Sequence, residues 1–72
     1  MKLDLEIADE GAIVLFTPIT ERARRWVQRT VAEHRQWFGP SLVIEHAFAQ
    51  VLVKEMTVDG LFFGAHRKGY VQ

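Results

Sequence analysis

The chain has 72 residues, with 9 lysines and arginines against 9 aspartates and glutamates, 49% hydrophobic residues and no cysteine. These figures predict one small folded domain, because at this size folding hides only about 60% of the surface of the unfolded chain. The absence of cysteine excludes disulfides, thiol nucleophiles, thiolate zinc sites and iron–sulfur clusters.

Two observations bear on membranes and compartment. No run of 18 apolar residues occurs, so we expect no membrane-spanning helix and no membrane partner. Residues 1–6 alternate apolar and charged side chains, whereas a signal peptide needs an unbroken apolar stretch. We therefore expect a cytoplasmic protein.

The first part of the chain predicts a β-hairpin. Apolar and charged residues alternate over residues 2–8, as in a strand with one buried face. Residues 9–11, Asp-Glu-Gly, predict a short hairpin loop. The second strand is expected over residues 12–17, and its unbroken apolar run at 13–16 is typical of a strand covered on both faces.

A helix is predicted next, over residues 21–35. Thr20 is a good N-cap residue, and neither glycine nor proline occurs in this range. One apolar stripe recurs at helical spacing and includes Trp26, while Arg22, Arg25 and Arg29 fall on another side.

The remaining segments predict a short strand, a second helix and a final strand. Gly39-Pro40 is a turn signal, and residues 42–44 follow as a short buried strand, with a single helical turn as the alternative. The helical pattern returns over residues 46–58, and Gly60 is expected to close that helix. Residues 61–63 predict the last strand.

These elements give one α+β domain over residues 1–65 and a polar C-terminal tail over residues 66–72. The expected order is ββαβαβ, with a four-stranded mixed sheet and two helices in a two-layer sandwich. We expect both helices on one sheet face, with Ile13, Leu15, Leu42, Ile44, Leu61 and Phe63 pointing toward them. The alternative is that the helices lie on opposite faces, or that the tail folds across the sheet.

The two-layer arrangement leaves apolar side chains on the second sheet face. Exposed apolar patches on small proteins mark contact surfaces, so we expect a protein-interaction module that self-associates as a homodimer. The proposed interface combines that face with aromatic residues at the turn before Gly39. Its members are Val14, Phe16, Trp37, Phe38, Val43 and Phe62.

Uneven charge suggests an alternative, nucleic-acid binding. Residues 1–19 carry a net charge of −3, and residues 20–35 carry +3. Arginines on one helix beside aromatic residues can bind phosphates and stack on bases. The zero net charge of the chain argues against this alternative. Its contacts would be Arg22, Arg25, Arg29, Arg67 and Lys68.

Catalytic and metal sites are not expected. His34, His46 and His66 lack the i, i+4 spacing of a helical zinc site, so we predict no bound metal and no other cofactor. Ser41 precedes Glu45 and His46, but a strand would separate that serine and histidine by roughly 15 Å. We therefore expect a protein that is not an enzyme.

The acidic residues of the hairpin are expected to have a different role. Asp4 with Glu6, and Asp9 with Glu10, form pairs of carboxylates on an exposed hairpin. We expect them to be solvated rather than catalytic.

Several short motifs resemble those of small uncharacterised proteins of bacterial genomes and prophages. They are the Thr-Pro-Ile-Thr segment at 17–20, Gln-Trp-Phe-Gly at 36–39, Val-Ile-Glu at 43–45 and Asp-Gly-Leu at 59–61. The resemblance implies a bacterial or mobile-element context and carries no catalytic or binding residue with it.

Overall fold

A hairpin begins the fold in the computed structural model, which describes residues 3–31 and 36–67. Strand β1 (Leu5–Asp9) pairs antiparallel with β2 (Ile13–Pro18). Gly11, in the loop between them, has a φ of 100°, which a residue with a side chain rarely adopts. Its N–H donates to Oδ1 of Asp9 at 2.9 Å. The predicted hairpin and its turn chemistry are therefore confirmed.

Helix α1 (Glu21–Thr30) begins where the sequence predicts and ends earlier. The Thr20 hydroxyl caps it by accepting from the N–H of Ala23 at 3.2 Å. The predicted helix continued to residue 35, but Val31 is its C-cap and a strand begins at Gln36. Residues 32–35 lie outside the described part.

Residues 36–67, the second described range, contain three strands and one helix. Strands β3 (Gln36–Phe38) and β4 (Ser41–Glu45) form an antiparallel hairpin, and helix α2 (His46–Val58) follows directly. Strand β5 (Phe63–Arg67) starts two residues later than predicted and extends into the expected tail. Residues 68–72 of that tail lie outside the described part.

Gly60 ends α2, as predicted. Its φ of 81° lets the chain reverse after Asp59, the C-cap. The N–H groups of Gly60 and Leu61 donate to the carbonyls of Thr57 and Met56, the hydrogen-bond pattern of a Schellman motif.

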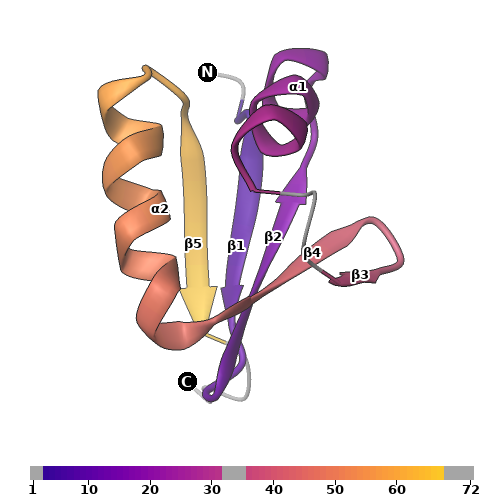
Figure 1. The fold of residues 1–72 in the computed structure, drawn as a ribbon, viewed down its shortest axis with the longest axis vertical. Coiled ribbons are helices and arrows are strands. Elements are labelled where there is room, and N and C mark those ends of the chain that lie inside the picture. Colours follow the sequence, from indigo (N-terminus) through magenta and orange to yellow (C-terminus); the bar gives the residue numbers. More distant parts are fainter. Residues whose placement is uncertain (1–2, 32–35, 68–72) are drawn as a thin grey trace.

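The sheet has five strands in the order β3-β4-β2-β1-β5, as Figure 1 shows. The four-stranded prediction is corrected by β3, which the sequence pattern missed. Strand β5 pairs parallel with β1, and the other three pairings are antiparallel, so the sheet is mixed as expected. The architecture is α+β with two helices.

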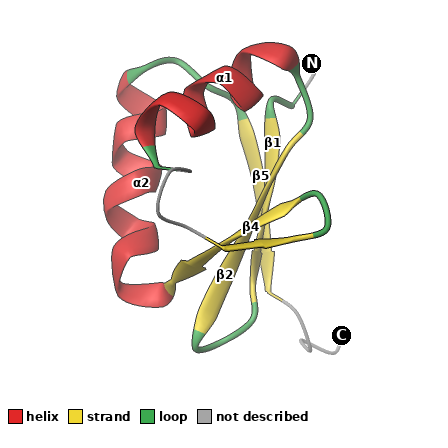
Figure 2. Cartoon of the chain, turned by 45° about the vertical axis from the view of Figure 1, so that its right-hand side comes forward, coloured by secondary structure: helices red, strands yellow, loops and turns green. Residues whose placement is uncertain are grey.

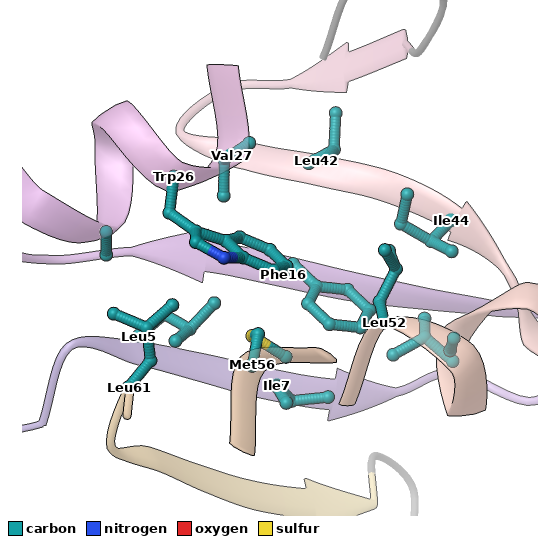
Figure 3. Close-up of a cluster of buried hydrophobic side chains, with 13 residues drawn as sticks. Leu5, Ile7, Phe16, Trp26, Val27, Leu42, Ile44, Leu52, Met56 and Leu61 are labelled. Atoms are coloured by element: carbon teal, nitrogen blue, oxygen red, sulfur yellow. The ribbon is translucent and has the colours of Figure 1, made fainter. Parts of the chain in front are cut away.

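Both helices lie on the same side of this sheet (Figure 2). Their buried side chains meet those of three strands in one core, in which Trp26 points from α1 toward the strands (Figure 3). The strands contribute Leu5, Ile7, Val14, Phe16, Leu42 and Ile44, and the helices and the turn after α2 contribute Ala23, Trp26, Val27, Ala49, Leu52, Met56 and Leu61.

One part of the predicted side-chain arrangement was wrong. Val14 and Phe16 are 4% and 1% exposed and belong to the core, whereas Ile13 and Leu15 alternate with them on the other face. The register explains this outcome, because Val14 pairs with Ile44 and Phe16 with Leu42. Directly opposed residues share a face, so the strand's core face is set by its partner.

Of the helices in the described ranges, none is long and apolar enough to cross a membrane.

Candidate functional site

A buried carboxylate joins the first strand to the first helix and the last loop. Asp4 is only 5% exposed. Its Oδ1 accepts from the Thr20 hydroxyl at 2.7 Å and from Arg22 Nε at 3.3 Å. Its Oδ2 accepts from Arg22 Nη2 at 3.1 Å and from the N–H of Phe62 at 2.9 Å. Asp4 is therefore a structural junction, and the prediction that it is solvated was wrong.

The same contacts stabilise the charged form of Asp4. The Arg22 guanidinium, the Phe62 N–H and the Thr20 hydroxyl hold the pKa of Asp4 well below its usual range, although burial opposes them. The carboxylate in turn raises the pKa of Arg22. Asp4 is thus ionised wherever the protein is folded near neutral pH.

Beside this junction, α1 and the turn after α2 enclose a groove of about 350 Å³. We call it the arginine groove, because the three arginines predicted to share one side of the helix line it together. The lining residues are Arg22, Arg25, Trp26, Arg29, Asp59 and Leu61.

The three arginines differ in how firmly they are held. Arg22 is fixed by Asp4 and also donates to the carbonyl of Gly60. Arg25 lies 3.6 Å from Glu21, an exposed pair of the kind that contributes little to stability. Arg29 has no acidic partner among residues 3–31 and 36–67. The groove therefore combines one guanidinium held by several hydrogen bonds with two that have at most an exposed ion pair.

A part-buried hydrogen bond joins two residues that line the groove. The indole N–H of Trp26 donates to Oδ2 of Asp59 at 2.6 Å. Trp26 is almost fully buried, so the prediction of an aromatic residue available for stacking on bases does not fit it. The bond fixes the Asp59 carboxylate opposite the arginines.

The second candidate surface is the sheet face away from the helices, which we call the open face. The register aligns Ala8, Leu15 and Val43 in one row across β1, β2 and β4. Ile13 lies on the same face beside this row. These four side chains are partly exposed, and no helix among the described residues covers them.

A polar row with an aromatic end borders the apolar row. The hydroxyls of Thr17 and Ser41 are 2.6 Å apart, and Ser41 pairs with Phe38 of β3. Phe38 is 71% exposed. The hydroxyl of Ser41 thus bonds within the sheet, and the open face ends at an exposed aromatic ring.

The residues predicted to form the interface do not share one surface in the structure. Val43 and Phe38 lie on the open face. The assignment of Val14 and Phe16 to a surface is corrected, because both are buried beneath the helices. The other two, Trp37 and Phe62, are partly exposed, with Trp37 opposite Leu42 and Phe62 in the loop before β5.

The predicted nucleic-acid contacts are brought together only in part. Arg22, Arg25 and Arg29 line one groove. The backbone of Arg67 lies at the far end of β5, paired with Asp9, and Lys68 is outside the described residues.

The histidines do not converge on a metal site in the described part of the chain. His46 Nε2 lies 3.2 Å from Asp9 Oδ2, which ties the start of α2 to the hairpin. His34 lies outside the described residues, and His66 is a β5 position paired with Ala8.

Sequence reasoning missed Asp4, Asp59 and Leu15 as members of these sites. The alternation over residues 2–8 predicted an exposed Asp4. Its contact with Arg22, 18 residues further along the chain, leaves no signal in the local pattern. Leu15 sits inside an apolar run that shows no face preference.

No protein-family model matches the chain, and no curated protein or solved structure is similar to it at the level that counts as a match. The resemblance to small bacterial and prophage proteins stays a prediction.

Proposed function

We propose that this protein is a non-enzymatic interaction module that binds a second copy of itself through the open face. The observation that carries the proposal is the row of Ala8, Leu15 and Val43 across three neighbouring strands. Ile13 adds to this surface beside Leu15, while Phe38 lies in the neighbouring polar row, in line with Ser41. A continuous apolar surface gains free energy when it is removed from water.

The size of the open face sets the expected strength. Five strands at about 4.8 Å spacing, most of them about five residues long at about 3.3 Å each, give a face of at most roughly 24 by 16 Å. Two such faces pack as in a β-sandwich, with their sheets about 10 Å apart. Two faces of roughly 380 Å² each bury about 770 Å² in total, below the range of about 1,200 to 2,000 Å² of stable specific interfaces, so we expect a weak, reversible homodimer.

The non-enzymatic part of the proposal is supported by the partners of the groups considered for catalysis. Ser41 bonds to Thr17, and His46 lies against Asp9, so neither is directed at the other. A cytoplasmic, bacterial or prophage setting is proposed on the sequence pattern and the short-motif resemblance.

Matched lysine substitutions test the homodimer. Val43→Lys places a charge on the open face, and Val58→Lys places the same charge on the outer side of α2, where the valine is 84% exposed. Sedimentation velocity over a concentration series should show reversible association of the wild type and of Val58→Lys. Val43→Lys should remain monomeric while its far-UV circular dichroism stays native.

The proposal is contradicted if the wild type sediments as a monomer up to about 1 mM, a concentration that corresponds to a binding free energy of only about 4 kcal/mol. It is equally contradicted if Val58→Lys abolishes association and Val43→Lys does not.

A further inference from the structure

The arginine groove is independent of the open face, since it lies between α1 and the turn after α2. We propose that it binds a small phosphate-bearing molecule with hydroxyl groups, such as a sugar phosphate, with the phosphate at the arginines and a hydroxyl at Asp59. The site is formed by Arg22, Arg25, Arg29 and Asp59.

The first support is a fixed guanidinium. Arg22 uses Nε and Nη2 for Asp4 and Gly60, which leaves Nη1 without an acceptor among the described residues. Arg22 remains about half exposed in spite of these bonds. A donor that is already held in place loses little conformational entropy when it binds an anion.

The second support is the spacing of the other two arginines. Arg25 and Arg29 are four residues apart on α1, so their side chains leave the helix on the same side. Guanidinium groups bind phosphate oxygens through paired N–H donors. Neither side chain has to break a buried contact to turn toward a ligand.

The third support is the acceptor on the opposite wall. Oδ2 of Asp59 accepts from the indole N–H of Trp26, and Oδ1 has no protein donor among the described residues. A carboxylate oxygen so placed accepts a hydroxyl but repels a second phosphate. The groove volume of about 350 Å³ also fits a small molecule.

The same features disfavour a nucleic-acid strand. Trp26 is 3% exposed and offers no ring face to a base. The chain has a net charge of zero, which gives little long-range attraction to a polyanion.

The test follows the indole N–H signals of ¹⁵N-labelled protein at constant ionic strength. Trp37→Phe identifies the Trp26 signal, because these are the two tryptophans of the chain. Inorganic phosphate and a hexose monophosphate should each shift that signal in a saturable way. The hexose monophosphate should bind about tenfold more tightly, as expected for one added hydrogen bond to a charged group.

Three variants assign the binding to the groove. Arg25→Gln/Arg29→Gln should weaken both ligands by at least about tenfold. Arg24→Gln, on the same helix but outside the groove, should bind like the wild type. Asp59→Asn should remove much of the preference for the hexose monophosphate over phosphate.

The inference is overturned by an absence of saturable shifts up to about 50 mM ligand, a range that would detect even millimolar affinity. It is also overturned if Arg24→Gln weakens binding as much as the double variant. A single-stranded oligonucleotide that binds the groove more tightly than the hexose monophosphate would replace the small-molecule ligand with a nucleic acid.

Discussion

The two faces of the sheet are made by alternate residues of the same strands, yet their side chains differ in how deeply they are buried. The covered face presents Phe16, Leu42 and Ile44 to the helices, and all three are fully buried. The open face presents Leu15 and Val43, which remain partly exposed. The difference shows that one face forms the core of the fold, while the other stays partly in water.

The largest expected effect is on the free energy of unfolding, which should fall much more for a substitution on the covered face than for one on the open face. Phe16→Ala removes a fully buried ring and should lower the free energy of unfolding by about 3 to 5 kcal/mol, enough to unfold much of so small a domain. Leu15→Ala should cost only about 1 kcal/mol, because its side chain is already partly in water in one isolated chain. Urea denaturation followed by circular dichroism measures both.

Equal losses for the two variants would show that the open face is buried in the folded chain.

The sequence predicts the covered face only where the pattern alternates. Leu5 and Ile7 were placed correctly, since charged residues separate them. In β2 the run Ile13–Phe16 is apolar throughout, so its core face depends on pairing with β4, a contact about 30 residues away. The local sequence pattern therefore does not predict the register between β2 and β4.

The missed strand β3 and the shifted bounds of β5 have their own reasons. Strand β3 has three exposed residues and no alternation, so it gives no strand signal. Strand β5 includes Gly64 and Ala65, which have low β propensity, and is formed because it pairs with β1. The arginine groove was partly predictable, since helical spacing placed its arginines on one side, but Asp59 comes from a distant turn.

The next effect concerns Asp4, which joins the start of β1 to the start of α1 and to the loop before β5. Asp4→Asn removes the charge that Arg22 faces and should lower the free energy of unfolding by about 2 kcal/mol at neutral pH. The loss is below that of a fully buried pair because Arg22 is about half exposed.

The acid dependence of stability provides an independent check of Asp4. Its pKa is lowered in the folded state, so the unfolded state takes up the proton first. The stabilisation is complete above about pH 5 and is lost progressively as the pH falls below about 4, the pKa of an unfolded aspartate. Urea denaturation should show a shallower decline for Asp4→Asn than for the wild type, and parallel declines would contradict the role of Asp4.

A smaller effect is expected where α1 meets the turn after α2. Trp26→Phe removes the donor to Asp59 and part of a buried ring system, and should cost about 1 to 2 kcal/mol. Asp59→Asn, which keeps an acceptor oxygen, should cost less. Thermal unfolding measures both, and a larger loss for Asp59→Asn would mean that the charge of Asp59, not the indole bond, stabilises this contact.

Methyl NMR spectra recorded over a dilution series test most directly the claim that the open face binds a second copy. The methyl signals of Ile13, Leu15 and Val43 should shift together with one dissociation constant, while those of Val14, Leu42 and Ile44 stay in place. The claim is contradicted if no open-face signal moves with concentration, or if the exposed Val51 and Val58 of α2 move instead.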